Sequence, residues 1–365
     1  MIMLSDLVSM YEKSIVNIGN QARVQQVLKQ AERGEKVTIG FLGGSITMGC
    51  GAEPMESNGY AAQTIAWFRE KYGSENITYV NAGIGATDSY LGVHRVEKDL
   101  LCYEPDLVIV EFSVNDGREC NEESYDSLIR KIYLSKSAPA VVLLFLTQRN
   151  GCDYQEVHER IGKHYDLPMI SYRNAVLEYI TSGRLPWTMI AKEEDGTHPG
   201  NMGHFLIASL LVRYFEEASK QKKMIGDTVF KGPYTTDRYK NARLYDNNNL
   251  LPTAAHDFEP ILLKEAQFSN GWRTTKGGDI AFYLNGKNIG IIYYGTQDEL
   301  SGMFDIYVDE EKVTTLNGDF VGKWGSYAEY QELIRTEKEK VHKVVIRKGK
   351  ESEKLQFTIL GFTVS

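Results

Sequence analysis

The chain has 365 residues, of which 42% are apolar and 25% are charged, and its formal net charge is -8. This length predicts two domains, since single hydrophobic cores rarely grow past about 250 to 300 residues, and the composition is that of an ordinary globular protein. The negative charge argues against a nucleic acid partner, because binding to phosphates depends on clustered Lys and Arg.

The N-terminal residues give no sign of export or membrane insertion. Asp6, Glu12 and Lys13 interrupt the apolar residues before a secretory core could form. No apolar run approaches the roughly 20 residues that a membrane-spanning helix needs. The four cysteines lack CxxC spacing, so we expect reduced thiols rather than a zinc or disulfide framework. We therefore expect a cytoplasmic protein with no membrane partner.

The chain begins with a predicted helical lead-in over residues 1–34, in which apolar residues recur at helical spacing. Residues 37–42 then form a short apolar run that breaks into the sequence GGSIT, which predicts a strand followed by a glycine turn with Ser45 at its tip. Gly43 and Gly44 leave Ser45 uncrowded, so its Oγ and its N–H could both face a ligand. Taken alone, the same turn fits a serine that only bonds its own backbone.

Strands and helices are predicted to alternate after this turn. The predicted strands are 77–81, 107–112, 140–146 and 169–171, and the helix-length segments between and after them are 89–101, 121–136, 153–165 and 173–182. Alternation of this kind predicts a parallel sheet covered by helices on both faces, a flavodoxin-like three-layer α/β/α domain. Ligands bind at the carboxyl ends of such strands. Ser45, the pair Gly85 and Ala86, and Asn115 each follow a strand directly, so we expect them at one edge.

The last element of this domain is the sequence DGTHPG, followed by an apolar helix from about residue 201 to 220. Asp195 lies three residues before His198, so its carboxylate could orient the imidazole through one nitrogen and leave the other free to take a proton. On its own, an Asp at this spacing is more often a helix cap beside an incidental His.

Four segments together are far more specific than any one of them. The sequences GGSIT, NAGIGATDS, FSVND and DGTHPGNMGH resemble the SGNH, or GDSL-type, hydrolase family block by block and in order. The resemblance implies the SGNH hydrolase fold for residues 35–225. It also implies Ser45 as nucleophile and Asp195 and His198 as the rest of a catalytic triad. The oxyanion hole would combine the N–H of Ser45, an N–H of the glycine loop and the side chain of Asn115.

Two positions depart from the family pattern. Gly44 stands where an Asp is usual, which removes a possible hydrogen bond but no catalytic atom. Ala86 stands where many members have a Gly that donates its N–H, so the donor in this chain is either Gly85 or Ala86.

Competing chemistry has little support in the sequence. His158 and His164 lie six residues apart, whereas a zinc-binding HExxH pair needs four. Asp116, Asp195, His198 and His204 could in principle form a metal cluster, but His204 lies within an apolar helix and fits a core histidine better. We therefore expect no metal and no other cofactor.

The second half of the chain changes character after residue 225. Residues 226–255 are rich in tyrosine and poor in Gly/Ser repeats, which predicts a linker packed on the catalytic domain rather than a flexible leash. Residues 256–365 alternate with a period of two, and the Asn-Gly pairs at 270–271, 285–286 and 317–318 are typical of hairpin turns. This pattern predicts an antiparallel, jelly-roll-like β-sandwich.

The order of the domains and the aromatics of the second resemble carbohydrate-binding modules attached to carbohydrate esterases. Trp272, Trp324, Tyr327 and Tyr330 are candidates for stacking on sugar rings, although each could equally fill the core. Trp324 stands out because it lies between glycines and outside the alternation.

The resemblance implies a serine esterase that removes a small acyl group, with acetyl favoured, from an acylated carbohydrate through an acyl-enzyme. One alternative is a lipase or thioesterase that uses the same triad on a non-carbohydrate ester. A second is a sugar-binding protein without activity. The expected partner is thus an acetylated oligosaccharide or another small acyl ester, and the oligomeric state is left open.

Overall fold

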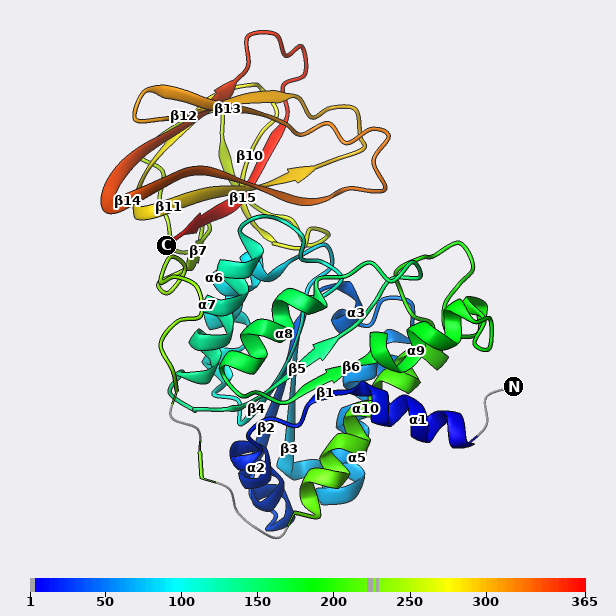
Figure 1. The fold of residues 1–365 in the computed structure, drawn as a ribbon. Coiled ribbons are helices and arrows are strands. Elements are labelled where there is room, and N and C mark those ends of the chain that lie inside the picture. The colour runs from blue at the N-terminus through cyan, green and yellow to red at the C-terminus, as the bar shows by residue number, and fades with distance from the viewer. Residues whose placement is uncertain (1–3, 222–225, 228–229) are drawn as a thin grey trace. The chain divides into compact units, whose positions relative to one another are not determined.

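The computed structural model describes residues 4–221, 226–227 and 230–365, and it divides into two compact units, Met1–Asp237 and Arg238–Ser365. The first unit alternates helices and strands, as expected (Figure 1). In chain order its elements are α1 (Leu4–Ser14), β1 (Ile15–Asn17), α2 (Ala22–Glu32), β2 (Val37–Gly43), α3 (Ser45–Met48), α4 (Met55–Asn58), α5 (Tyr60–Tyr72), η1 (Ser74–Asn76), β3 (Ile77–Gly83), α6 (Ser89–Asp99), η2 (Leu101–Tyr103), β4 (Leu107–Glu111), α7 (Asn121–Tyr133), β5 (Ala140–Phe145), α8 (Gln155–His164), β6 (Met169–Ser171), α9 (Tyr172–Thr181), η3 (Trp187–Met189) and α10 (Asn201–Ser219).

These strands form one sheet with the order β1-β6-β5-β4-β2-β3. All neighbours are parallel except β1, which pairs antiparallel with β6 at the edge. The expected α/β fold is therefore confirmed. The chain passes from β2 to β3 on one side and then to β4 on the other, so the order reverses between β2 and β4. Ligands of open α/β sheets bind at such a reversal, outside the carboxyl ends of the strands.

Helices cover both faces of this sheet, which explains why its central strands are apolar without alternation. Phe41 and Ile109 lie in a core with α2, α5, α9 and α10. On the opposite face, α6 packs closely on the end of β4 and on α7, since a Cβ on Gly92 would lie 2.9 Å from the Phe112 ring and 3.3 Å from Leu128. All five residues of β4 are buried as a result.

The N-terminal region differs from the single helical lead-in that we expected. Residues Ile15–Asn17 form β1, and α2 contributes Val24, Leu28 and Ala31 to the core, so this region is part of the first unit. Helix α5 begins after Gly59, directly behind Asn58, the last residue of α4. The expected domain end at residue 225 lies outside the described residues.

The second unit is an antiparallel sheet folded around its own apolar core, and Figure 1 shows its strands in two layers. Its main order is β13-β12-β14-β11-β15-β10-β9, with β7 paired to β15 and β8 to β11. The strands are β7 (Arg243–Tyr245), β8 (Ala254–His256), β9 (Glu259–Leu262), β10 (Asn270–Thr274), β11 (Asp279–Gly295), β12 (Met303–Val308), β13 (Glu311–Asn317), β14 (Tyr327–Lys348) and β15 (Phe357–Val364). The expected sandwich architecture is confirmed.

None of the three Asn-Gly pairs forms the expected hairpin turn. Asn317 ends β13, which pairs with β12 and not with the following strand β14. Asn270-Gly271 lies inside β10, where a Cβ on Gly271 would approach Ile359 O to 2.0 Å, so the glycine serves the close approach of β15. Asn285-Gly286 lies inside β11 at a shift in its pairing with β14, as glycines at bulges do.

The segment that we expected to be a linker is divided between the units. Within the first unit, Thr235 donates to the carboxylate of Asp126 on α7, and Asp227 accepts from Tyr133. Within the second, residues 243–245 and 254–256 form β7 and β8.

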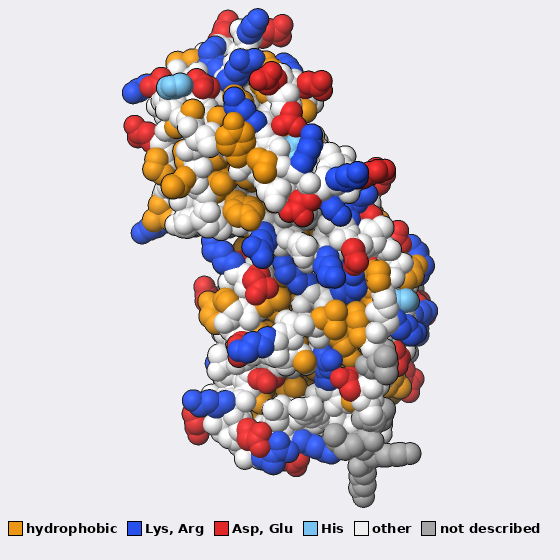
Figure 2. Space-filling model, turned by 90° about the vertical axis from the view of Figure 1, so that its left-hand side faces the viewer, with side chains coloured by type: hydrophobic (Ala, Val, Ile, Leu, Met, Phe, Trp, Pro, Cys, Tyr) orange, Lys and Arg blue, Asp and Glu red, His pale blue; other side chains and the backbone are white. Residues whose placement is uncertain are grey.

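The surface carries charges of both signs. Figure 2 shows Lys and Arg interspersed with Asp and Glu over the face that it presents, with apolar side chains in small groups between them. Among the described residues, no helix combines the length and the apolar character that crossing a bilayer requires.

Candidate active site

Ser45 is the first residue of the short helix α3, directly after β2. It is half-buried, and the two glycines before it are closely surrounded. A Cβ on Gly43 would lie 2.1 Å from Thr47 Oγ1, and a Cβ on Gly44 would lie 2.2 Å from Asn115 Oδ1. The glycines thus do more than expose Ser45, because they give Thr47 and Asn115 the space that side chains would occupy.

His198 and Asp195 form a hydrogen-bonded chain with this serine. Ser45 Oγ lies 2.9 Å from His198 Nε2, and His198 Nδ1 lies 2.9 Å from Asp195 Oδ2. The other carboxylate oxygen, Asp195 Oδ1, accepts the N–H groups of Thr197 at 2.8 Å and His198 at 2.9 Å. Partial burial raises the pKa of Asp195, but these two amides and the imidazole outweigh it, so the net pKa is lowered and the group stays a carboxylate.

The loop that carries His198 is fixed from two directions. Trp187 Nε1 donates to Asp195 O at 2.7 Å. His204 is fully buried and accepts Tyr60 N–H at Nδ1, while its Nε2 donates to Cys50 O. Burial lowers the pKa of His204, consistent with a neutral ring that holds the segment after Ser45 against α10.

The proposed oxyanion donors lie on two further loops. Asn115 follows β4, and its amide group lies against Gly44, as the 2.2 Å approach above shows. Gly85 follows β3, and a Cβ built on it would lie 3.8 Å from Ser45 Cβ. Ala86 takes a φ of 57°, a left-handed conformation that costs an alanine roughly 1 kcal/mol. Which N–H group of the glycine loop donates to the oxyanion, that of Gly85 or that of Ala86, therefore stays a prediction with two alternatives.

The residues of the alternative metal cluster are committed to other partners. His204 uses both nitrogens for Tyr60 and Cys50, and Asp116 accepts from Ser89 and His158. Among the described residues, no three His, Cys, Asp or Glu side chains are gathered closely enough to hold a metal.

An open depression of about 500 Å³ borders His198 and Asp195. Its wall is formed by the segment after Ser45 and by Lys192, and it carries more charged than large apolar side chains. The lining residues are Cys50, Gly51, Ala52, Glu53, Pro54, Met55, Glu56, Lys192, Asp195 and His198. A separate apolar cavity of about 400 Å³ lies between α1, α9 and α10, and none of Ser45, Asp195 and His198 lines it.

The aromatic candidates of the second unit divide into buried and exposed residues. Trp272 is 2% exposed and packs on Phe282 and Phe362, so its proposed role in sugar stacking is wrong. Tyr330 is also buried. Trp324 is 73% exposed and stacks on Tyr327, with ring centroids 4.3 Å apart and planes 5° apart.

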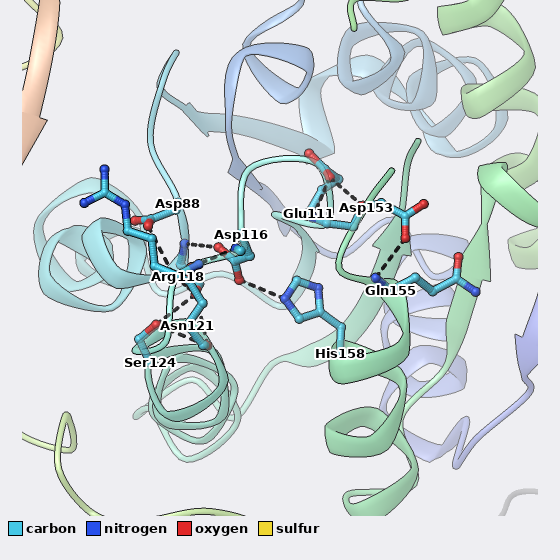
Figure 3. A network of polar contacts seen from close by, with 12 residues as sticks. Asp88, Glu111, Asp116, Arg118, Asn121, Ser124, Asp153, Gln155 and His158 are labelled. Atoms are coloured by element: carbon cyan, nitrogen blue, oxygen red, sulfur yellow. Dashed lines mark hydrogen bonds and ion pairs between the residues drawn. The ribbon is translucent and has the colours of Figure 1, made fainter. Parts of the chain in front are cut away.

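Sequence reasoning missed a buried polar network beneath the Asn115 loop (Figure 3). Asp116 and His158 lie 2.8 Å apart with fully buried side chains, and Glu111 is buried close by. The only signal in the sequence was the Asp that follows Asn115, because nothing local connects it to a histidine on α8.

Comparison with known proteins identifies relatives over nearly the whole chain. The model of the GDSL-like lipase/acylhydrolase family matches residues 41–205. Two solved structures of a two-domain esterase (CEX) active on acetylated mannans, one of them co-crystallised with mannopentaose, are each 32% identical to this chain. Each match covers 97% of this chain and 97 or 98% of the other, with TM-scores of 0.87 and 0.88. A search of curated proteins found no match.

Proposed function

The chain belongs to the GDSL-like lipase/acylhydrolase family and is a carboxylic ester hydrolase, and we propose that it removes acetyl groups from an acetylated oligosaccharide of the mannan type. Ser45 is the nucleophile, His198 the general base and acid, and Asp195 the residue that orients His198. The oxyanion hole combines the N–H of Ser45, the N–H of Gly85 or Ala86, and the side chain of Asn115.

The observation that carries this proposal is the chain from Ser45 Oγ to His198 Nε2 and from His198 Nδ1 to Asp195 Oδ2, each step 2.9 Å long. The first distance lies within the range needed for proton transfer from a nucleophile to its base, and the second lies within the range of a hydrogen bond that orients the base. The Asp195 carboxylate accepts a hydrogen bond from Nδ1–H, which holds the ring in the tautomer whose Nε2 lone pair is directed at the serine.

The reaction then runs in two halves. His198 takes the proton of Ser45 Oγ as that oxygen attacks the acetyl carbonyl carbon, and the carbonyl oxygen becomes an oxyanion. Collapse of this intermediate breaks the bond to the sugar oxygen, which leaves with the proton from His198 and gives an acetyl-serine. Water, deprotonated by His198, attacks the acetyl-serine, and acetate departs as Ser45 recovers its proton.

The choice of a carbohydrate acetyl ester rests on three supports. The solved relatives that match nearly the full chain are described as active on acetylated mannans. The depression beside His198 is open and carries several charged side chains, and the apolar cavity of the first unit is not lined by Ser45, which favours a short acyl group on a hydroxyl-rich alcohol over a long acyl chain. The exposed ring of Trp324 on Tyr327 offers an apolar face of the kind on which sugars stack.

The test is the loss of acetate release in Ser45→Ala. We expect kcat on acetylated manno-oligosaccharide to fall by at least about 10⁴-fold, because the members of a triad act as a unit. The melting temperature should hardly change, since Ser45 is half-buried and loses one hydroxyl. Nitrophenyl acetate should be hydrolysed faster than the butyrate and octanoate esters.

Retained activity in Ser45→Ala would refute the nucleophile. Faster hydrolysis of the octanoate ester would instead support the lipase or thioesterase alternative and refute the acetyl preference.

A further inference from the structure

A buried carboxylate lies directly behind the loop that carries Asn115. The side chain of Asp116 is fully buried, and each of its oxygens accepts a hydrogen bond from a different element. Oδ1 accepts the N–H of Ser89 at the start of α6, at 2.8 Å, and Oδ2 lies 2.8 Å from His158 Nε2 on α8 (Figure 3). Asp116 therefore joins three segments that are far apart in the sequence.

The bond to Ser89 connects the two loops that supply the proposed oxyanion donors. Ser89 lies three residues after Ala86, at the point where the glycine loop turns into α6. Asn121 reinforces the connection, because its Nδ2 donates to Asp88 Oδ2 and its Oδ1 accepts the N–H of Gly117. The glycine loop and the Asn115 loop are thus bonded to each other through Asp116 and Asn121.

His158 holds Asp116 from the opposite side. Its ring stacks on Tyr125, with centroids 3.6 Å apart and planes 6° apart, which fixes the direction of Nε2. Burial lowers the pKa of His158 to about 3 and raises the pKa of Asp116, so the ring is neutral and a single hydrogen bond joins its Nε2 to Asp116 Oδ2. The residue before α8 also contacts this loop, since Tyr154 N–H donates to Ser113 O at 2.7 Å.

We propose that Asp116 and His158 are positioning residues, which fix the separation between the Asn115 side chain and the glycine-loop amide. This inference rests on the proposed function, in which both groups bind the same oxyanion. Oxyanion donors act only when they lie about 2.7 to 3.1 Å from the place where the charge develops. A displacement of about 1 Å at such a site can cost on the order of 100-fold in rate.

Stability alone gives a weaker reason for this pair. A buried pair of polar groups can often be replaced by apolar residues at no loss of stability. An aspartate and a histidine that serve only the core would therefore affect folding without a specific effect on the transition state. A positioning role therefore predicts a lower kcat when the pair is broken, whereas a role in core stability alone predicts an unchanged kcat in the folded protein.

The experiment is a double-mutant cycle between His158→Phe and Asn115→Ala. Phenylalanine keeps a ring against Tyr125 but removes the donor to Asp116. In the wild-type background we expect His158→Phe to lower kcat on nitrophenyl acetate by about 10- to 100-fold, with KM changed by less than about two-fold. In the Asn115→Ala background the same change should cost about three-fold or less, because the donor that it displaces is already absent.

Two further variants separate positioning from general damage. His94→Phe is the matched control, because His94 is also buried and its Nδ1 bonds to Tyr90 O within α6, so kcat should be unchanged even if the melting temperature falls. His158→Gln can still donate to Asp116 and should retain most of kcat. If His158→Phe does not fold, His158→Leu carries the cycle, since it also removes the hydrogen bond to Asp116 and keeps an apolar side chain against Tyr125.

The experiment distinguishes failure of the positioning role of Asp116 and His158 from failure of the proposed function. An equal loss of kcat in both backgrounds, or a loss matched by His94→Phe, would overturn the positioning role. An unchanged kcat in Asn115→Ala alone would overturn the oxyanion role of Asn115 itself.

Discussion

At the scale of single residues, the close contact between Gly44 and Asn115 restricts which residue can occupy position 44 in this chain. The Asn115 amide lies against Gly44, so a side chain at residue 44 and the present position of Asn115 exclude each other. The backbone of Gly44, with φ -89° and ψ -150°, is open to other residues. The constraint on this position is therefore steric and comes from Asn115.

We expect Gly44→Ala to impair catalysis without straining the backbone. The new Cβ would displace the Asn115 side chain, whose donor would be worth about 3 to 4 kcal/mol to the transition state. Loss of part of that interaction should lower kcat on nitrophenyl acetate by about 10-fold or more, with KM nearly constant. Steady-state kinetics at saturating substrate measure the effect.

Gly117→Ala is the control for this prediction. Gly117 lies two residues after Asn115, and a Cβ built on it meets nothing within 4 Å, so its kcat should match that of the wild type. A wild-type kcat in Gly44→Ala would show that Asn115 can move without cost and would contradict its assignment as a fixed donor.

The candidate catalytic residues were identified in the sequence through the four segments that resemble the SGNH family. Topology adds support for Ser45 and Asn115, because both come after strands of the parallel sheet, at the edge where its ligands bind. The contacts of Gly44 with Asn115 and of Asp116 with His158 could not be predicted in this way. They join positions that are distant in the sequence, and a local sequence pattern does not indicate which distant side chains contact each other.

At the scale of elements, the end of β4 carries a carboxyl group in an apolar environment. Glu111 is fully buried, and its Oε1 accepts the N–H of Ser113 at 2.9 Å and its hydroxyl at 3.1 Å. Burial raises the pKa of Glu111 to about 7, although the bonds from Ser113 oppose the shift. The folded protein therefore holds this proton at a pH where the unfolded chain releases it.

Because Glu111 is protonated in the folded protein, the first unit should become less stable as the pH rises and this carboxyl group ionises. The stabilisation that results from the raised pKa of Glu111 is fully present below about pH 4.5 and is lost as the pH rises through about 7. The loss amounts to about 3 kcal/mol in the free energy of unfolding. Glutamine can accept both bonds from Ser113 but does not titrate. We expect Glu111→Gln to lose less stability than the wild type between pH 5 and pH 8.

Urea unfolding followed by residual esterase activity would measure this difference, since activity reports on the first unit. Glu97→Gln, which changes an exposed carboxylate on α6, should give the same pH dependence as the wild type. Parallel curves for the wild type and Glu111→Gln would mean that Glu111 is ionised in the folded protein.

Sequence reasoning identified well the elements with a strong apolar pattern. The buried strands β2, β4 and β5 are continuous apolar runs, the amphipathic helices have helical spacing, and the strands of the second unit alternate. Strand β1 has only three residues and forms because it pairs with β6. This contact is non-local, and the helical pattern on both sides of β1 predicted one continuous helical region. The glycines of β10 and β11 were misread for a similar reason, since each accommodates a neighbouring strand rather than a turn.

At the scale of the whole molecule, a hydrolase unit and a β-sandwich occur in one chain, and the same two-domain description applies to the relatives that it matches at full length. Joining a binding unit to a catalytic unit raises the effective concentration of a substrate that both can contact. Such an arrangement benefits a long substrate that carries several acetyl groups more than a small ester. The second unit should therefore matter for oligosaccharides and not for nitrophenyl acetate.

Trp324 is the residue through which we expect this difference to arise. Its ring is 73% exposed, and Tyr327 supports it from one face at 4.3 Å, so the indole is held as a flat apolar surface. Truncation of a tryptophan at a binding surface typically costs more than about 1.4 kcal/mol, which is a factor of ten in affinity. We expect Trp324→Ala to lower kcat/KM on acetylated manno-oligosaccharide by about 10-fold and to leave nitrophenyl acetate hydrolysis unchanged. Tyr283→Ala, which removes another exposed ring of the sandwich, is the control and should leave both substrates unaffected. Equal losses on the two substrates in Trp324→Ala would indicate damage to folding rather than loss of a sugar contact, whereas no loss on either would exclude the indole from substrate binding.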